Sequence, residues 1–189
     1  MTKGNRFLAR HHEKPSLNQY WYSAFTIDTL IKELEDAAEA VAFVSTPSVY
    51  FSLDKESKLR PRSWLFDFDE KWSKDPHFVF YDYASPSDVP PALRHSFDCV
   101  VVDPPFVSGE VWAKYIETSR LLLAPQGGRV VLSTISENAG MLREALGAKP
   151  CLFKPSIPTL VYQYSFFTNF DTKYLNTRNQ ELPCEDDAA

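Results

Sequence analysis

Phe97-Asp98-Cys99-Val100-Val101-Val102-Asp103-Pro104-Pro105-Phe106 is the stretch that decides the fold. Its apolar run from Cys99 to Val102 is uninterrupted, which is typical of a parallel strand buried on both faces. An acid, two prolines and an aromatic residue end that run. The stretch therefore predicts a buried strand that presents a fixed polar site at its carboxyl end.

The four residues after this strand form a rigid group of hydrogen-bond acceptors. Each proline fixes its own φ and lacks an N–H, and a residue that precedes proline is kept extended. The carboxylate of Asp103 and the carbonyl of Pro104 suit a ligand NH₂ group, and the ring of Phe106 suits a flat base or an amine stem. Asp103, Pro104, Pro105 and Phe106 are therefore the candidate catalytic residues. A simple turn at the end of a strand is the alternative interpretation.

Length and composition predict one globular domain. The chain has 189 residues, of which 44% are hydrophobic and 24% charged, so a substantial core is expected. The net charge of −5 argues against broad, sequence-independent binding to nucleic acid, which needs a basic surface. No apolar run is long enough to span a bilayer and no signal-peptide core is visible, so we expect a cytoplasmic location without membrane contact.

Cysteine and histidine show no metal-binding or disulfide pattern. The three cysteines are odd in number and far apart, and the four histidines lack ligand spacing. The sequence therefore predicts neither a bound metal nor a disulfide framework. The residues concerned are Cys99, Cys151, Cys184, His11, His12, His77 and His95.

Acids follow two more predicted strands. Residues 63–69 predict a second strand, and a carboxylate at its end suits ribose hydroxyls, with Asp69 the first choice and Asp67 the second. Residues 78–81 predict a third strand, and Asp82 after it is placed to accept from an adenine amino group. A solvated strand end is the alternative for either acid of the second strand.

The rest of the chain completes a seven-stranded sheet. Strand patterns alternate with helical patterns, which predicts a mostly parallel α/β sheet with helices on both faces. Ser23 or Thr26 is expected to cap the first helix, and Ser108 a later one. Residues 149–153 and 159–170 predict a closing antiparallel hairpin around a turn at 155–158. The domain is expected over residues 19–170, between a flexible arm at 1–18 and a polar tail at 171–189.

Several segments resemble one known family. Asp103-Pro104-Pro105-Phe106 matches the (Asp/Asn/Ser)-Pro-Pro-aromatic motif of class I S-adenosylmethionine-dependent methyltransferases that modify amino nitrogens. Three further segments look like the elongation factor 1-alpha lysine methyltransferase 1 family, formerly labelled putative N6-adenine DNA methyltransferases, and the resemblance spans roughly residues 19–170. These segments are Gln19-Tyr20-Trp21-Tyr22-Ser23, Val44-Ser45-Thr46-Pro47-Ser48-Val49-Tyr50 and Phe78-Val79-Phe80-Tyr81-Asp82-Tyr83.

The resemblance implies a Rossmann-like fold, S-adenosylmethionine as cofactor with S-adenosylhomocysteine as product, and a lysine of translation elongation factor 1-alpha as target. The turn after the first strand carries no glycine, unlike most such sheets, but the family resembled has the same substitution. In that family the segment around Tyr22 folds over the active site. The candidate cofactor-binding residues are Tyr22, Ser23, Ser45, Thr46, Pro47, Asp67, Asp69, Asp82, Tyr83 and Asp103.

Two other functions fit the same residues. Methylation of adenine N6 in DNA or RNA suits the Asp-Pro-Pro-Phe motif equally well, and nucleic acid is a partner only in that case. A non-catalytic nucleoside-binding protein is the third interpretation, and the complete set of acceptors argues against it. No general base is evident from the sequence.

Overall fold

One mixed sheet of seven strands organises the computed structural model, which describes residues 4–183. The strand order is β3-β2-β1-β4-β5-β7-β6, and β7 alone runs antiparallel to its neighbours. This confirms the predicted mostly parallel sheet with antiparallel C-terminal strands. The strands are β1 Val41–Val44, β2 Trp64–Asp67, β3 Phe78–Phe80, β4 Cys99–Val102, β5 Arg129–Thr134, β6 Lys149–Pro150 and β7 Ser165–Thr168.

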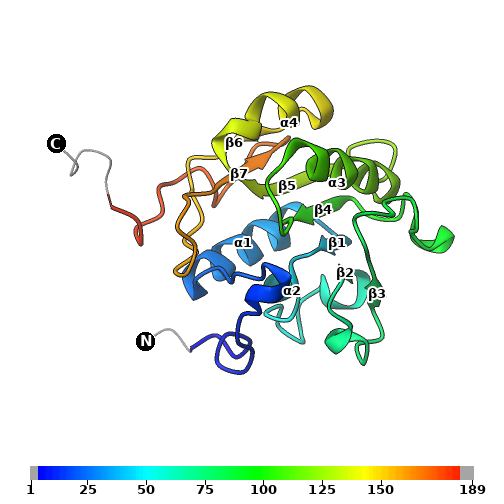
Figure 1. Cartoon of the computed structure of the whole chain (residues 1–189), viewed down its shortest axis with the longest axis horizontal. Helices are drawn as coiled ribbons and strands as arrows, with labels where there is room; N and C mark the ends of the chain where they lie inside the picture. The colour runs from blue at the N-terminus through cyan, green and yellow to red at the C-terminus, as the bar shows by residue number, and fades with distance from the viewer. Residues whose placement is uncertain (1–3, 184–189) are drawn as a thin grey trace.

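Helices cover both faces of the sheet, as predicted (Figure 1). On one face α1 packs with α2, and on the other lie α3 and α4. The α-helices are α1 Ala24–Ala37, α2 Pro47–Tyr50, α3 Gly109–Leu122 and α4 Ala139–Leu146. Single 3₁₀ turns make the remaining helical segments: η1 Pro15–Leu17, η2 Arg60–Arg62, η3 Glu70–Trp72, η4 Pro91–Leu93 and η5 Ser136–Asn138.

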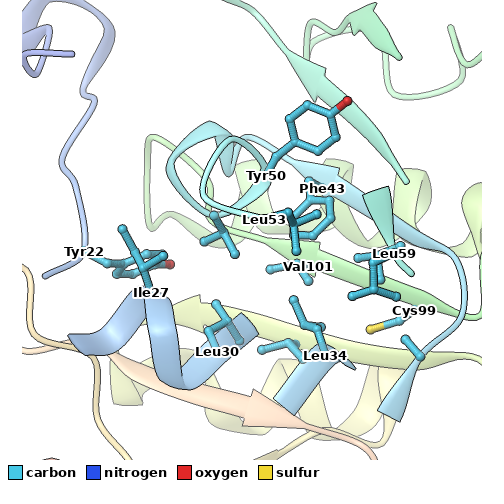
Figure 2. Close-up of a cluster of buried hydrophobic side chains, with 14 of the residues drawn as sticks. Tyr22, Ile27, Leu30, Leu34, Phe43, Tyr50, Leu53, Leu59, Cys99 and Val101 are labelled. Carbon is cyan, nitrogen blue, oxygen red and sulfur yellow. The ribbon is translucent and has the colours of Figure 1, made fainter. Parts of the chain in front are cut away.

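Local sequence explains why these helices begin where they do. The hydroxyl of Ser23 accepts from the N–H of Thr26 at 3.0 Å and caps α1, and Ser108 caps α3 in the same way. Leu30 and Leu34 lie on one face of α1 and point toward the β4 strand (Figure 2). All four residues of β4 are buried, as expected for a central parallel strand.

The closing strands are shorter than predicted. β6 has two residues and β7 four, and residues 151–164 between them form an irregular connection rather than a tight hairpin. The exposed Val161 and Tyr162 lie in this connection, although the alternation of Tyr162, Tyr164 and Phe166 with polar residues predicts a strand there. Alternation alone cannot distinguish a paired strand from an extended loop, because pairing depends on a partner elsewhere in the chain.

Residues 4–18 pack on the domain instead of extending from it as the expected flexible arm. The side chain of Phe7 is only 3% exposed, and its ring lies 5.2 Å from that of Trp21 and 5.7 Å from that of Trp72. No periodic pattern marks this segment in the sequence, because these contacts are long-range and do not repeat. Residues 1–3 lie outside the described part.

The expected polar tail also packs, as far as residue 183. The buried carboxylate of Glu33 in α1 accepts from the backbone N–H groups of Lys173, Tyr174 and Leu175. Leu175 is fully buried. The domain therefore extends beyond the predicted boundary at residue 170, and Cys184 lies outside the described residues.

Candidate active site

A cavity of about 790 Å³ opens at the carboxyl edge of the parallel strands. This is where ligands bind in open α/β sheets. The residues expected at successive strand ends meet in its wall, although they are far apart in sequence. The predicted site residues that line it are Ser45, Pro47, Asp67, Asp69, Asp82, Tyr83, Asp103, Pro104, Pro105 and Phe106.

Asp103 lies at the end of β4, where its N–H donates to the carbonyl of Val44 in the neighbouring strand. Burial raises the pKa of its carboxyl group to about 7, and the nearby hydroxyls of Tyr22 and Ser133 offset part of that effect. No lysine or arginine forms an ion pair with this acid within residues 4–183. The carboxylate is therefore ready to accept a positively charged or hydrogen-bond-donating ligand.

The end of β2 presents a different electrostatic arrangement. β2 ends at Asp67, and Asp69 follows it as the N-cap of η3. Lys14 donates to both carboxylate oxygens of Asp69, at 3.0 and 2.8 Å, and Lys71 and Gln19 add further bonds. The pKa of Asp69 is lowered because these donors outweigh the opposing effect of its burial.

Asp67 is the more deeply desolvated of the two acids after β2. Burial raises the pKa of its carboxyl group to about 7, while the N–H of Asp69, which donates to it at 2.8 Å, lowers it. The two acids thus share one cavity but do not share an environment. The ribose hydroxyls expected at this strand end would meet Asp69, which forms ion pairs with lysines, and Asp67, which accepts only from a backbone N–H among the described residues.

Aromatic rings form the wall beside the motif. The ring of Phe106 is 47% exposed and lies 6.2 Å from the ring of Tyr83, edge to face. Tyr83 in turn stacks on Tyr115 of α3 at 6.1 Å. The exposed face of Phe106 is free to pack on a substrate group.

The turn after β1 approaches the cavity without glycine. Ser45 adopts a left-handed conformation with φ 57°, and its hydroxyl pairs with the hydroxyl of Tyr115 at 2.8 Å. Thr46 is buried, and its hydroxyl has no hydrogen-bond partner among residues 4–183. An unpaired buried hydroxyl is costly, so this turn carries a local energetic penalty.

Three expected cofactor-binding residues do not line the cavity: Tyr22, Ser23 and Thr46. Tyr22 is 1% exposed and belongs to the core, with its hydroxyl near Asp103. Burial and that neighbouring carboxylate raise the pKa of Tyr22 above its ordinary value. The hydroxyl of Ser23 is occupied by helix capping and by a bond to Glu181.

The cavity also uses Gln19, Tyr20 and Trp21 of the family-like segment, which were not named as site residues, and others that the sequence did not single out. Residues 16–21 line one side of the cavity, and Glu137 of η5 and Tyr164 also belong to its wall. The aromatic density around residue 20 was the available signal, but Trp21 is buried and hydrogen-bonds the carbonyl of His11, so this segment is anchored in the core. Glu137 carried no signal, because a lone acid after a strand resembles a solvated one.

Residues 4–183 show neither a metal-binding cluster nor a membrane-spanning helix. No group of three or more His, Cys, Asp or Glu side chains is arranged to hold a metal ion. No described helix has the length and apolarity needed to cross a bilayer.

The fold and the edge at which the cavity opens define the class of protein. A solved structure titled a predicted O-methyltransferase from Agrobacterium tumefaciens superimposes with a TM-score of 0.53 at 12% identity, over 75% of this chain and 78% of that one. The precorrin 8w decarboxylase structure from Methanobacterium thermoautotrophicum gives 0.50 at 13% identity, over 85% and 96%. These likenesses, together with the strand order, show the class I methyltransferase fold.

Sequence relatives narrow this class. Residues 13–172 match the family described as “Probable N6-adenine methyltransferase”. EEF1A lysine methyltransferase 1 of Mus musculus is 34% identical, over 85% of this chain and 76% of that protein. Protein-lysine N-methyltransferase EFM5 of Saccharomyces cerevisiae is 33% identical, over 89% and 69%. The chain belongs to the EEF1A lysine methyltransferase 1 family.

Proposed function

We propose that this protein transfers a methyl group from S-adenosylmethionine to the side-chain amine of a lysine in a protein substrate. One observation carries this proposal. The described lining of the cavity has five acidic side chains and no lysine, arginine or histidine. Such a lining attracts cations and repels the phosphates of nucleic acid. The acids are Asp67, Asp69, Asp82, Asp103 and Glu137.

The residues present fit the cofactor. Carboxylates after β2 and β3 can accept from ribose and adenine donors, and Ser45 and Ser48 of the turn after β1 bring hydroxyl groups to the cavity wall. When bound, S-adenosylmethionine supplies an electrophilic methyl group on a positively charged sulfur. The acidic lining complements that charge. Asp67, Asp69 and Asp82 would hold the nucleoside.

The Asp-Pro-Pro-Phe loop would orient the attacking nitrogen. The carboxylate of Asp103 and the carbonyl of Pro104 accept the hydrogens of the amine, so that its lone pair points away from them and into the cavity. Phe106 packs on the lysine stem. Lysine has an ordinary pKa of about 10.4, so its ammonium group binds first and must release one proton to solvent before the neutral amine can attack. Removal from water and the positive charge of the cofactor favour this release, and the carboxylate of Asp103 opposes it. Positioning and desolvation are therefore the main catalytic contributions.

The target protein and the location belong to the same proposal. The names of the relatives point to elongation factor 1A as the substrate. Translation elongation takes place in the cytoplasm, which agrees with the location expected from the sequence. Both statements depend on the family and not on the geometry of the site.

Adenine N6 methylation is the second candidate, favoured by the description of the family that residues 13–172 match. The motif alone would serve either substrate. The acidic lining argues against a polyanionic one, because each phosphate near the cavity would face carboxylates.

Radiolabelled cofactor distinguishes the two candidates. The protein is incubated with S-adenosylmethionine carrying a labelled methyl group and, separately, with purified elongation factor 1A, with total RNA and with double-stranded DNA. Label on the protein, removed by protease and mapped to lysine by mass spectrometry, is the expected result. Label found only on nucleic acid would overturn the proposal.

A further inference from the structure

The loop that carries the Asp-Pro-Pro-Phe motif has little means of holding its own backbone in place. Pro104 and Pro105 have no N–H to donate, so two successive residues contribute no backbone hydrogen bond as donors. Two asparagine side chains from elsewhere in the chain compensate. Asn18 Nδ2 donates to the carbonyl of Pro105 at 2.9 Å, and Asn138 Nδ2 donates to the carbonyl of Val107 at 2.8 Å.

Asn18 is itself fixed by the local backbone. It follows η1 with a left-handed φ of 51°, a conformation that asparagine tolerates better than most residues, and its N–H donates to the carbonyl of Pro15. The same segment holds the acid on the cofactor side, because Lys14 and Gln19 donate to Asp69. Residues 14–19 thus connect the end of β2 to the motif after β4.

Asn138 is anchored on the opposite side. Its Nδ2 also donates to the hydroxyl of Thr134 at the end of β5, at 2.9 Å. That hydroxyl accepts from the indole N–H of Trp112 in α3, at 3.0 Å, and Trp112 is fully buried. The clamp on Val107 is therefore tied to the core.

We propose that Asn18 and Asn138 are positioning residues for methyl transfer, which clamp the motif loop on both sides of Phe106. This inference rests on the proposed function. The clamped carbonyls are those of Pro105 and Val107, whereas none of the residues in 4–183 donates to the carbonyl of Pro104. The clamps leave the Pro104 carbonyl available to the substrate and keep the Phe106 ring beside Tyr83.

The physical consequence is preorganisation. A reacting group displaced by about 1 Å can lose on the order of 100-fold in rate, so a loosened loop should lower kcat more than it changes ligand affinity. Neither asparagine is expected to touch the reacting atoms. Their loss should therefore leave the pH dependence set by Asp103 in place while lowering the rate.

Isosteric substitutions test the clamps. Asn18→Asp and Asn138→Asp keep the shape and remove the N–H donor, and Asn18→Gly and Asn138→Ala remove it without adding charge. Asn169→Asp is the matched control. Asn169 Nδ2 likewise donates to a backbone carbonyl, that of Gly128 at 2.9 Å, but beside the start of β5, at the edge of the sheet opposite the cavity.

Three measurements are made on each variant: kcat with the protein substrate, affinity for S-adenosylhomocysteine by calorimetry, and the rate of chymotrypsin cleavage after Phe106, followed by mass spectrometry. We expect the four clamp variants to lose about 10- to 100-fold in kcat and to be cleaved faster, with cofactor affinity within about twofold of wild type. The control should match wild type in all three.

Unchanged kcat and cleavage in the clamp variants would overturn the proposal. Parallel losses in the clamp variants and in Asn169→Asp would also overturn it, because the asparagines would then be only structural. Failure of the proposed function appears differently, as absence of transfer to protein by the wild type. In that case the cleavage rates still decide whether the clamps hold the loop.

Discussion

Asp69, two residues after β2, and Asp103, directly after β4, are in opposite electrostatic states, although both line one cavity. Asp69 is held by Lys14, Lys71 and Gln19, and its pKa is lowered. Asp103 has no such cation among residues 4–183, and burial raises its pKa to about 7. The charge of Asp69 is thus balanced by lysines of the protein itself, whereas that of Asp103 is left for a ligand to balance. A cationic amine is the substrate that such an acid suits.

The largest expected effect is on catalysis at Asp103. Asp103→Asn keeps an acceptor oxygen and removes the charge, so methyl transfer to the protein substrate should fall by roughly 100-fold or more, and Asp103→Ala should abolish it. Initial rates with labelled cofactor measure this, and circular dichroism checks that the variants fold. Rates near wild type for D103N would indicate that the charge is not needed, which favours adenine as substrate.

The second effect concerns stability and pH. The folded-state pKa of Asp103 is raised, so its stabilising contribution is complete below its unfolded value of about 3.9 and is lost as pH rises to about 7. D103N does not titrate at this position. Its free energy of unfolding relative to wild type should therefore increase between pH 4 and 7, by about 1–3 kcal/mol.

Urea unfolding at several pH values between 4 and 8 measures this difference. Asp67 titrates in both proteins and cancels in the comparison. A difference that stays constant with pH would show that Asp103 is as well solvated in the folded state as in the unfolded one.

The third effect is on cofactor binding. Asp69→Ala and Asp82→Ala should each weaken S-adenosylhomocysteine binding about 10-fold, because each removes an acceptor from the cavity wall. Isothermal calorimetry at one salt concentration measures the affinity. Asp88→Ala is the control, since Asp88 is an exposed acid outside the lining. Unchanged affinity in both variants would contradict the assignment of the cofactor side.

The smallest effect is expected at Lys14. Its side chain is 42% exposed, and Lys71 remains paired with Asp69 when it is removed, so Lys14→Met should cost less than about 1 kcal/mol of unfolding free energy. This cost should begin to fall below the unfolded pKa of about 3.9 and disappear as pH falls through the lowered folded-state pKa of Asp69. A much larger loss in thermal unfolding would mean that Lys14 alone holds residues 4–18 in place.

Much of the fold followed from local patterns. The run Cys99–Val102 predicted the central strand because only a residue buried on both faces needs to be apolar at every position. Ser23 and Ser108 predicted the starts of α1 and α3 through the chemistry of helix capping. The acids after β2, β3 and β4 could be assigned to one cavity, since the carboxyl ends of parallel strands share an edge.

Other features could not be read locally. The 151–164 connection continues an alternating pattern yet lacks a partner for most of its length, and Phe7 is buried by rings from three distant segments. Tyr22 and Ser23 were expected in the site because the family that the sequence resembles folds this segment over its active site. Packing instead directs one into the core and uses the other as a cap.

The sequence by itself determined which parallel strands are followed by polar residues, where the Asp-Pro-Pro-Phe motif lies and which family the chain resembles. These depend on residue type and spacing along the chain. Only the tertiary structure decided that Lys14 pairs with Asp69, that no cation of the described part of the chain pairs with Asp103, and that two asparagines 120 positions apart in the chain hold one loop. Ion pairing, desolvation and side-chain hydrogen bonds depend on distances between atoms, and folding sets those distances through contacts that leave no periodic trace in the sequence.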